Sequence, residues 1–211
     1  MGSKERIARL KSELRKDILC AALAILKNDG RQSLSLRKIA DRIEYSPPVI
    51  YSYFKNKEAI LIALCELCYQ QFNGCIEKNC RKLTNPEERL TAIVTTCWNF
   101  AIDEKEMYDL MWEVGSTCTD PFTQFKELGL FLNFLSETLK NLCGKKVCTE
   151  EYLLHKSQTA IAVMHGHICL NYTLSNADPK LRSRMLNETI LYVMNLINDY
   201  NLTPHELNNH Y

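Results

Sequence analysis

The residues with the clearest chemical potential lie in one short run, from Ser46 to Glu58. It has the sequence SPPVIYSYFKNKE, in which hydroxyl and phenol groups are interleaved with basic residues. Such groups donate hydrogen bonds to phosphate oxygens, and small apolar groups beside them can contact base edges in the major groove. Placed directly after another short helix, this run has the layout of a helix-turn-helix whose second helix enters a DNA groove.

A short helix is predicted just before this run. Ser35 can cap it, and it extends to about Ile43 because apolar residues recur there every three or four positions on one face. Arg37, Lys38 and Arg42 are left on the opposite face.

The second short helix follows a break at residues 44–46. Ser46 is its expected N-cap, and Pro47 suits the first helical position because the missing N–H would have no partner there. About seven helical residues are expected, with Ile50 and Phe54 one turn apart and facing inward. The residues expected to project outward are Val49, Ser52 and Tyr53.

A family resemblance runs through these elements. The string SLSLRKIADRIEYSPPVIYSYFKNKEAI resembles the DNA-binding domain of the TetR family of transcriptional regulators, over residues from about 15 to 64. The aromatic pair, the Phe after it and the Lys-Glu-Ala-Ile start of the next helix, which Asn56 is expected to cap, have the family's spacing. The turn position that usually carries Gly holds Glu44 here. A left-handed backbone at this residue would cost about 1 kcal/mol.

The resemblance implies a set of DNA contacts. Tyr51, Tyr53 and Lys57 match positions that grip phosphates, the last assisted by the positive end of its helix. The second helix carries no Arg, Asn or Gln for bidentate base reading, so discrimination is expected to depend on basic residues of the first helix, DNA shape and an N-terminal arm. Facing the bases we expect Pro47, Pro48, Val49 and Ser52; the other expected DNA contacts are Ser35, Arg37, Lys38, Ser46 and Lys55.

Charge is unevenly distributed along the chain. Residues 1–60 contain 13 Lys or Arg and 7 Asp or Glu, whereas residues 61–211 contain 13 and 18, and the whole chain has a net charge of +1. A basic module can neutralise phosphates, and an acidic body adds little to nucleic-acid affinity. Chance clustering on a solvated face is the alternative explanation.

The composition predicts an all-α protein. Only 7 Gly and 6 Pro occur among 211 residues, 46% of residues are hydrophobic, and long stretches follow a period near 3.6. We expect an N-terminal three-helix helix-turn-helix domain at residues 1–57 and a C-terminal helical effector-binding and dimerisation domain at 58–211. Without an uninterrupted apolar run of about 18 residues or an apolar N-terminus, we expect a cytoplasmic protein with no membrane partner.

Several longer helices are predicted outside the helix-turn-helix. The first runs from about Lys4 to Lys27 and stops at Gly30. The last two are apolar on more than one face, which favours a homodimer in which they form a four-helix bundle; burial within a monomer is the alternative. After the long helix that begins at Lys57, helices are expected at about 86–103, 105–115, 120–142, 149–175 and 178–200.

An effector pocket is expected in the C-terminal domain. The segment YDLMW at 108–112 and the pair His165-Gly166 resemble one type of TetR C-terminal domain, although Ile161 stands where that type has Trp. For each candidate lining residue, ordinary core packing is the alternative. The candidates are Trp98, Tyr108, Met111, Trp112, Phe122, Phe125, Met164, His165 and Tyr172.

The chain contains ten cysteines. Cys65 and Cys68 share an apolar stripe and are expected in the core, because no second CxxC or His pair completes a four-ligand zinc site. Cys118, Cys143 and Cys148 fall in expected loops and are the better candidates for reactivity, although a cytoplasmic chain should keep them reduced.

Three functional hypotheses follow. The first is an effector-controlled dimeric repressor that a small, largely apolar molecule releases from a palindromic operator on double-stranded DNA. The second is a thiol- or metal-responsive sensor with the same DNA-binding domain. The third is an enzyme, which the sequence disfavours because it shows no Ser-His-Asp order, Gly-rich phosphate loop or HExxH motif. We therefore expect no catalytic activity, no cofactor and no resident metal.

Overall fold

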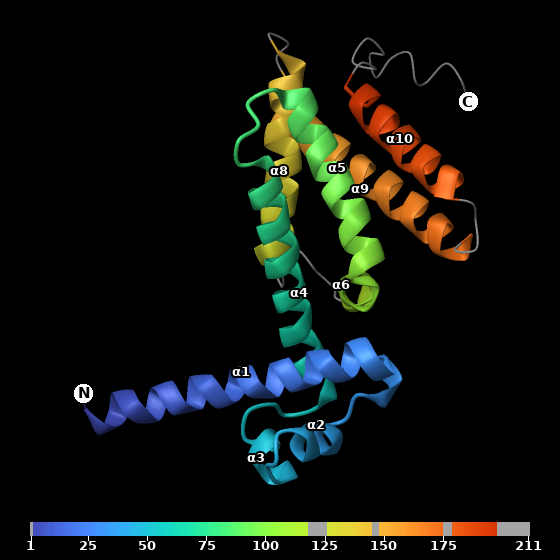
Figure 1. The fold of residues 1–211 in the computed structure, drawn as a ribbon. Helices are drawn as coiled ribbons and strands as arrows, with labels where there is room; N and C mark the ends of the chain where they lie inside the picture. Colours follow the sequence, from blue (N-terminus) through green and yellow to red (C-terminus); the bar gives the residue numbers. More distant parts are fainter. Residues whose placement is uncertain (1, 118–125, 145–147, 175–178, 198–211) are drawn as a thin grey trace. The chain divides into compact units, whose positions relative to one another are not determined.

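The structure is a computed structural model, and it describes residues 2–117, 126–144, 148–174 and 179–197. Within these ranges every regular element is a helix, which confirms the all-α prediction (Figure 1). The elements are α1 (Ser3–Asp29), the 3-10 turn η1 (Arg31–Ser33), α2 (Leu36–Arg42), α3 (Pro47–Tyr51), α4 (Lys57–Cys80), α5 (Pro86–Asp103), α6 (Lys105–Thr117), α8 (Lys126–Cys143), α9 (Glu150–Thr173) and α10 (Pro179–Asn195).

Contacts group these elements into two compact units. The first contains the chain up to Gln71 together with α6, and the second begins at Phe72 and contains α5, α8, α9 and α10. Helix α4 is therefore shared by both units. The division into domains at 1–57 and 58–211 remains a prediction.

Helix α1 packs on the first unit through its second half. Ile18, Ala22 and Ile25 are fully buried, while the residues from Lys4 to Glu13 are exposed. The helix ends at Gly30, whose positive φ of 76° suits glycine and whose N–H donates to the carbonyl of Leu26 at 3.1 Å.

The turn between α2 and α3 has a defined hydrogen-bonding pattern. Glu44 adopts φ 58°, so the left-handed backbone expected of a glycine position is present with a side chain on it. Tyr45 N–H donates to Ala40 at 3.0 Å and Glu44 N–H donates to Asp41 at 3.4 Å, which is the Schellman pattern. The turn therefore accepts the cost of a non-glycine residue while keeping the carbonyls of α2 paired.

Helix α3 is shorter than expected, five residues instead of about seven. The chain beyond Tyr51 continues in turns, since the N–H groups of Tyr53 and Phe54 still donate to the carbonyl of Ile50. Ser46 stands at the N-cap, but its side chain makes no capping bond. Two consecutive prolines leave few N–H groups to cap, and the first available one, on Val49, donates to the backbone carbonyl of Ser46 at 3.0 Å.

The caps of the neighbouring helices are as expected. Ser35 Oγ accepts from the N–H of Lys38 at 3.2 Å at the start of α2, and Asn56 Oδ1 accepts from Ala59 at 2.9 Å at the start of α4. Among the described helices, α4 is long and apolar enough to cross a membrane by length and composition alone. Its most apolar window has a mean hydropathy of 1.3 and is 56% buried within the protein, as a core helix would be.

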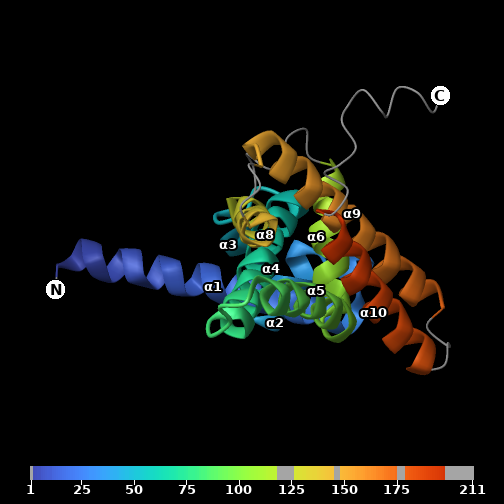
Figure 2. The same cartoon turned by 90° about the horizontal axis from the view of Figure 1, so that it is seen from above.

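The core of the second unit centres on an aromatic cluster. Phe72 meets Phe100 and Phe131 edge to face, with ring centroids 5.2 and 4.9 Å apart. Helices α8 and α10 both pack on α5 and on α9, and Figures 1 and 2 show α9 and α10 side by side. The start and end of α5 agree with the predicted 86–103. Residues 118–125, within which the helix predicted at 120–142 was expected to start, lie outside the described ranges.

Two polar bonds join α9 to its neighbours α5 and α10. The hydroxyl of Tyr172 on α9 donates to the carbonyl of Ala101 on α5. His167 Nδ1 lies 2.6 Å from Thr189 Oγ1 on α10, and that hydroxyl donates its only proton to Met185 at 2.7 Å. The proton between the two side chains therefore belongs to His167 Nδ1. These bonds fix the register of α9 against α5 and α10.

The cysteines are mainly core residues. Cys65 and Cys68 are fully buried, which confirms their expected place in the core. Burial raises the pKa of the Cys68 thiol to about 12, with Lys27 lowering it and Glu104 raising it by smaller amounts. The expectation that Cys143 lies in a loop is wrong, because it is buried in the last turn of α8. The helix predicted at 120–142 ended one residue too early to include Cys143.

Candidate nucleic-acid interface

The α2–α3 region presents aromatic groups to the outside on a buried support. Ile50 and Phe54 point into the core, being 0% and 4% exposed, and so hold α3 in place. Tyr51, between them, is 57% exposed, and Tyr53 is half-buried. The inward assignment of Ile50 and Phe54 is therefore confirmed, whereas of the three residues expected to project outward only Ser52 is exposed.

Of the residues expected to face DNA bases, Pro47, Pro48 and Val49 lie in the first turn of α3 and Ser52 is its C-cap. Pro48 and Ser52 are exposed, while Pro47 and Val49 are half-buried. Ser52 Oγ donates to the carbonyl of Val49 at 2.6 Å, so the serine oxygen remains available as an acceptor. This edge therefore offers apolar surface and one acceptor, a combination suited to thymine methyl groups and to base amino groups.

The basic residues of this region differ in how firmly they are held. Lys38 Nζ pairs with Asp29 at 2.7 Å, and the half-buried Lys57 donates through Nζ to the carbonyl of Arg31 at 3.1 Å. Each ammonium has three N–H donors, so both retain donors for a phosphate. Arg37 and Lys55 are exposed, and neither forms an ion pair with any residue that the structure describes.

Contacts from α1 and α6 brace this region within the first unit. The guanidinium of Arg15 lies 5.1 Å from the ring centroid of Phe54, a cation–π contact on the same ring that anchors α3. Ion pairs join Lys27 to Glu104, in the turn before α6, and Arg31 to Glu113 of α6. The backbone carbonyl of Arg31 also receives Lys57, so η1 links α6 to the start of α4.

Two further exposed residues of this region, Arg42 and Tyr45, were not among the DNA contacts predicted from the sequence. Tyr45 is 47% exposed at the end of the α2–α3 turn, while its backbone N–H closes the Schellman pattern. Arg42 is exposed in the last turn of α2. Their position next to the turn at Glu44 could have identified them as candidate DNA contacts from the sequence.

The candidate effector residues divide between the two units. Tyr108 and Met111 are buried in α6 of the first unit, where Trp112 is half-buried and its ring centroid lies 6.0 Å from that of Tyr108. In the second unit Trp98 and Met164 are buried, whereas His165 and Tyr172 are half-buried. Phe122 and Phe125 lie outside the described residues. The expected pocket remains a prediction.

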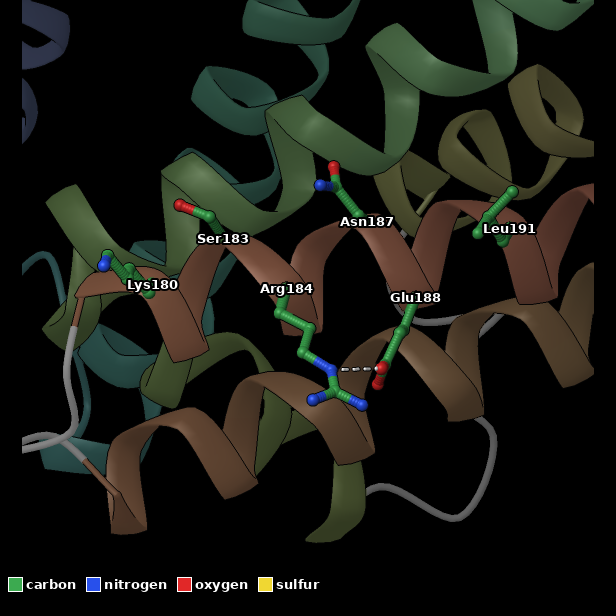
Figure 3. Close-up of a pocket in the computed structure, with 6 residues that line it drawn as sticks. All are labelled: Lys180, Ser183, Arg184, Asn187, Glu188 and Leu191. Atoms are coloured by element: carbon green, nitrogen blue, oxygen red, sulfur yellow. Dashed lines mark hydrogen bonds and ion pairs between the residues drawn. The ribbon is translucent and has the colours of Figure 1, made fainter.

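One open surface of the second unit lies along a single helix. Figure 3 shows Arg184 and Glu188 joined by an ion pair of 2.8 Å on one side of α10, with Ser183 and Asn187 on the other. Leu191, at the end of this surface, is 59% exposed. Residues from one convex helix do not enclose a ligand, so this is an exposed face available to a larger partner.

The described part of the chain contains no set of side chains that could bind a metal ion. No group of three or more His, Cys, Asp or Glu side chains that could hold an ion occurs there. One pair is notable: Cys169 Sγ lies 3.4 Å from Nε2 of His165, one turn earlier on α9, and the cysteine is exposed.

Comparisons with known proteins agree with the helix-turn-helix geometry. Residues 18–64 match the family model described as bacterial regulatory proteins, tetR family. The chain is 27% identical over 113 residues to the transcriptional activator FasR of Mycolicibacterium smegmatis, covering 53% of this chain and 52% of FasR. It is 27% identical over 97 residues to the transcriptional repressor NicS of Pseudomonas putida, covering 46% of each. The chain thus spans about half the length of these relatives.

The fold is shared over a larger part of the chain. The regulator FadR of Bacillus subtilis, solved in complex with stearoyl-CoA, superimposes with a TM-score of 0.66 at 17% identity, covering 85% of this chain and 97% of FadR. This likeness concerns the fold. Residues 18–64, which include α2, α3 and the start of α4, thus match the tetR family of bacterial regulatory proteins, within a fold that most of the chain shares with FadR.

Proposed function

We propose that this protein is a sequence-specific DNA-binding transcriptional regulator that acts as a homodimer. The observation that carries the proposal is the α2–α3 surface, on which Tyr51 is exposed while Ile50 and Phe54 are buried and hold it in place. Two such surfaces related by a two-fold axis reach successive major-groove faces about 34 to 36 Å apart. The operator is therefore a palindrome, read in the cytoplasm where the DNA lies.

Different residues of this surface have different roles, which follow from their chemistry. Arg37, Lys55 and the hydroxyl groups of Tyr51 and Tyr53 supply phosphate contacts, which set affinity and register. The start of α3 supplies apolar contacts and its C-cap supplies the Ser52 oxygen, and these discriminate among bases. With two prolines at its start, α3 has few backbone N–H groups that could bind a phosphate, so side chains make the phosphate contacts.

Selection of bound duplexes from a random pool tests the proposal directly. We expect enrichment of a palindromic site, and a salt titration of that site in which the logarithm of affinity falls linearly with the logarithm of salt concentration. No enrichment, or binding that is insensitive to salt, contradicts the proposal.

Substitutions separate phosphate contacts from the rest of the molecule. Arg37→Ala should weaken binding to all sequences by about tenfold and reduce the salt slope by roughly two, because each dimer loses two phosphate contacts. The matched control is Lys140→Ala on α8, an exposed cation of the second unit. Equal losses in the two variants would exclude a specific role for the α2–α3 surface.

We place the dimer contact on α9 and α10. Both helices carry large apolar side chains that the described residues leave more than half exposed: Leu191 and Tyr192 on α10 are 59% and 56% exposed, and Leu170 on α9 is 52% exposed. A second copy that buries them would form a four-helix bundle, the arrangement that two-faced helices favour.

Sedimentation of a charged variant tests this contact. Leu170→Glu combined with Leu191→Glu should convert dimer to monomer at micromolar concentration, since a buried unpaired carboxylate is costly. Leu10→Glu, at an exposed apolar position of α1, is the control and should leave the dimer intact. A monomeric parent protein, or a dimer that the α1 change disrupts instead, contradicts this placement.

A small, largely apolar effector is proposed to release the protein from its operator, so that the unliganded dimer represses. Support comes from the fold shared with FadR, which was solved with stearoyl-CoA, and from the apolar core of the second unit around Trp98 and Met164. Titration of the tryptophan fluorescence with long-chain acyl compounds tests it, with operator release at the same concentrations as the expected result. Trp98→Phe identifies which of the two tryptophans responds.

A second candidate is regulation through a thiol, favoured by the contact between Cys169 and His165. A neighbouring imidazole can accept the thiol proton and leave a nucleophilic thiolate. If this candidate holds, an alkylating reagent abolishes operator binding of the parent protein but not of Cys169→Ser. Identical inhibition of both excludes this thiol.

A further inference from the structure

A basic cleft lies at the turn between α4 and α5, within the second unit. It has a volume of about 790 Å³, which is within the range of small-molecule sites. Its wall is formed by the last turns of α4, the residues that follow it, the first turn of α5 and one aromatic ring of α8. The side chains that matter below are Lys78, Arg81, Lys82, Arg89, Glu77 and Phe134.

The cleft is positively charged, whereas the rest of the C-terminal part of the chain has a net negative charge. Residues 61–211 contain more acidic than basic side chains, yet the cleft is lined by four cations and a single carboxylate, that of Glu77. A second carboxylate, that of Glu137, reaches Arg89 from outside the lining at 3.9 Å. An excess of positive charge therefore remains after both carboxylates are counted.

Three of the cations have an ordinary structural explanation. Lys78, Arg81 and Lys82 lie in and just beyond the last turn of α4, where the negative end of a helix favours cations. All three are exposed, and none makes an ion pair with a residue that the structure describes. The helix end accounts for their presence, but it leaves their N–H donors available.

Arg89 has no such explanation. It lies in the first turns of α5, near the positive end of the helix, where a cation is disfavoured. Its Nε is buried and has no partner among the described residues, and its one carboxylate contact, at 3.9 Å, is too long for a hydrogen bond. A buried N–H donor of a guanidinium without an acceptor is costly, so an acceptor supplied by a ligand would stabilise this side chain.

We propose that this cleft binds a small molecule carrying two or more phosphate groups, with an apolar or aromatic part packed on Phe134. Phosphate oxygens match the geometry of a guanidinium and can bridge it to the lysines. The N–H groups at the start of α5 do not take part, because Asn85 Oδ1 already accepts from Glu87 and Glu88. The side-chain cations and the half-buried ring of Phe134 therefore define the ligand.

Calorimetric titration of the full chain with inorganic pyrophosphate and with ATP tests the proposal. We expect saturable binding of one molecule per chain, tighter for ATP because its base can pack on Phe134. The variant Lys78→Gln/Lys82→Gln should bind pyrophosphate at least about tenfold more weakly, since hydrogen bonds to charged groups are the stronger class. The control, Lys140→Gln/Arg182→Gln, removes the same charge from exposed positions elsewhere in the unit and should bind as the parent does.

Two further variants sharpen the result. Arg89→Gln should weaken pyrophosphate binding as well, with its melting curve checked against the parent for folding. Phe134→Leu should abolish the preference for ATP over pyrophosphate. No saturable binding, or equal weakening in the cleft and control variants, overturns the proposal. So does a random DNA duplex that displaces pyrophosphate and loses affinity in Lys78→Gln/Lys82→Gln, because the cleft would then be a nucleic-acid contact. None of these outcomes depends on recognition of an operator.

Discussion

The two units of this protein expose different kinds of side chain. The first presents phenol rings, prolines and cations around α3, with Tyr51 more than half exposed. The second presents aliphatic side chains along α9 and α10, with Leu191 equally exposed. The first surface suits a polyanion with a patterned groove, and the second suits another apolar surface. Exposure alone therefore does not define function; the chemistry of what is exposed does.

The units also differ in how their conformation is fixed. Around α2 and α3, short-range bonds set the geometry: the Ser35 and Asn56 caps and the Schellman turn at Glu44. In the second unit, bonds between distant residues do so, such as Tyr172 with Ala101 and His167 with Thr189. Local order is readable from short strings of residues, whereas long-range order requires the packed fold.

The largest expected effect tests the contrast between a buried and an exposed aromatic ring. Phe72→Ala should reduce the free energy of unfolding by about 3 to 5 kcal/mol, because it removes a ring that packs on Phe100 and Phe131. Tyr51→Ala should change it by less than about 0.5 kcal/mol, since that ring is mostly exposed. Urea unfolding measures both. Comparable losses would mean that Tyr51 is a packing residue, and would weaken its assignment to DNA.

Alkaline pH should destabilise both units through buried thiols. Burial raises the pKa of Cys97 in α5 from 9.0 to about 12, and that of Cys68 in α4 likewise to about 12. Because these folded-state pKa values exceed the unfolded ones, the contribution to stability is complete below pH 9 and is lost as pH rises towards 12. At pH 10 the loss should be on the order of 1 kcal/mol per thiol.

Urea unfolding at pH 8 and pH 10 measures this loss. Cys97→Ala should be less stable at both pH values but should lose less between them than the parent does. An unchanged pH dependence in that variant would show that other groups control alkaline stability.

The next effect compares two serines at helix starts in the first unit. Ser35→Ala should reduce stability by about 1 kcal/mol, because the hydroxyl caps α2 through the N–H of Lys38. Ser46→Ala should have almost no effect on stability, since its side chain makes no capping bond at α3. Thermal melts of the two variants distinguish them. Equal shifts would mean that Ser46 caps α3 in solution.

The smallest expected effect concerns the turn before α3. Glu44→Gly should raise stability by somewhat under 1 kcal/mol, because glycine adopts φ 58° without strain but gains more freedom in the unfolded chain. Gly30→Ala, at the other left-handed position of the first unit, is the opposite control and should destabilise. Denaturant midpoints for the pair check the sign. A destabilised Glu44→Gly would point to a favourable contact of the glutamate side chain.

The amino-acid sequence alone determined the helical class, the helix-turn-helix and the two residues, Ile50 and Phe54, that anchor α3 in the core. These follow from hydrophobic period, proline and serine positions and capping residues, all of which act within a few residues of each other. It also determined that Cys65 and Cys68 belong to the core. It misplaced Cys143 because the end of a helix is set by what the last turn packs against, which lies far away in the sequence.

The tertiary structure decided which charges and rings are held and which are available. Lys57 is tied to Arg31 and Lys38 to Asp29, whereas Arg37 remains exposed, and no spacing rule separates these three. Likewise, only packing brings Phe134 of α8 to the cations at the end of α4 and leaves the Nε of Arg89 buried without an acceptor. Burial and long-range contacts change the energy of a polar group far more than its neighbours in sequence do, which is why these features appear only in the folded chain.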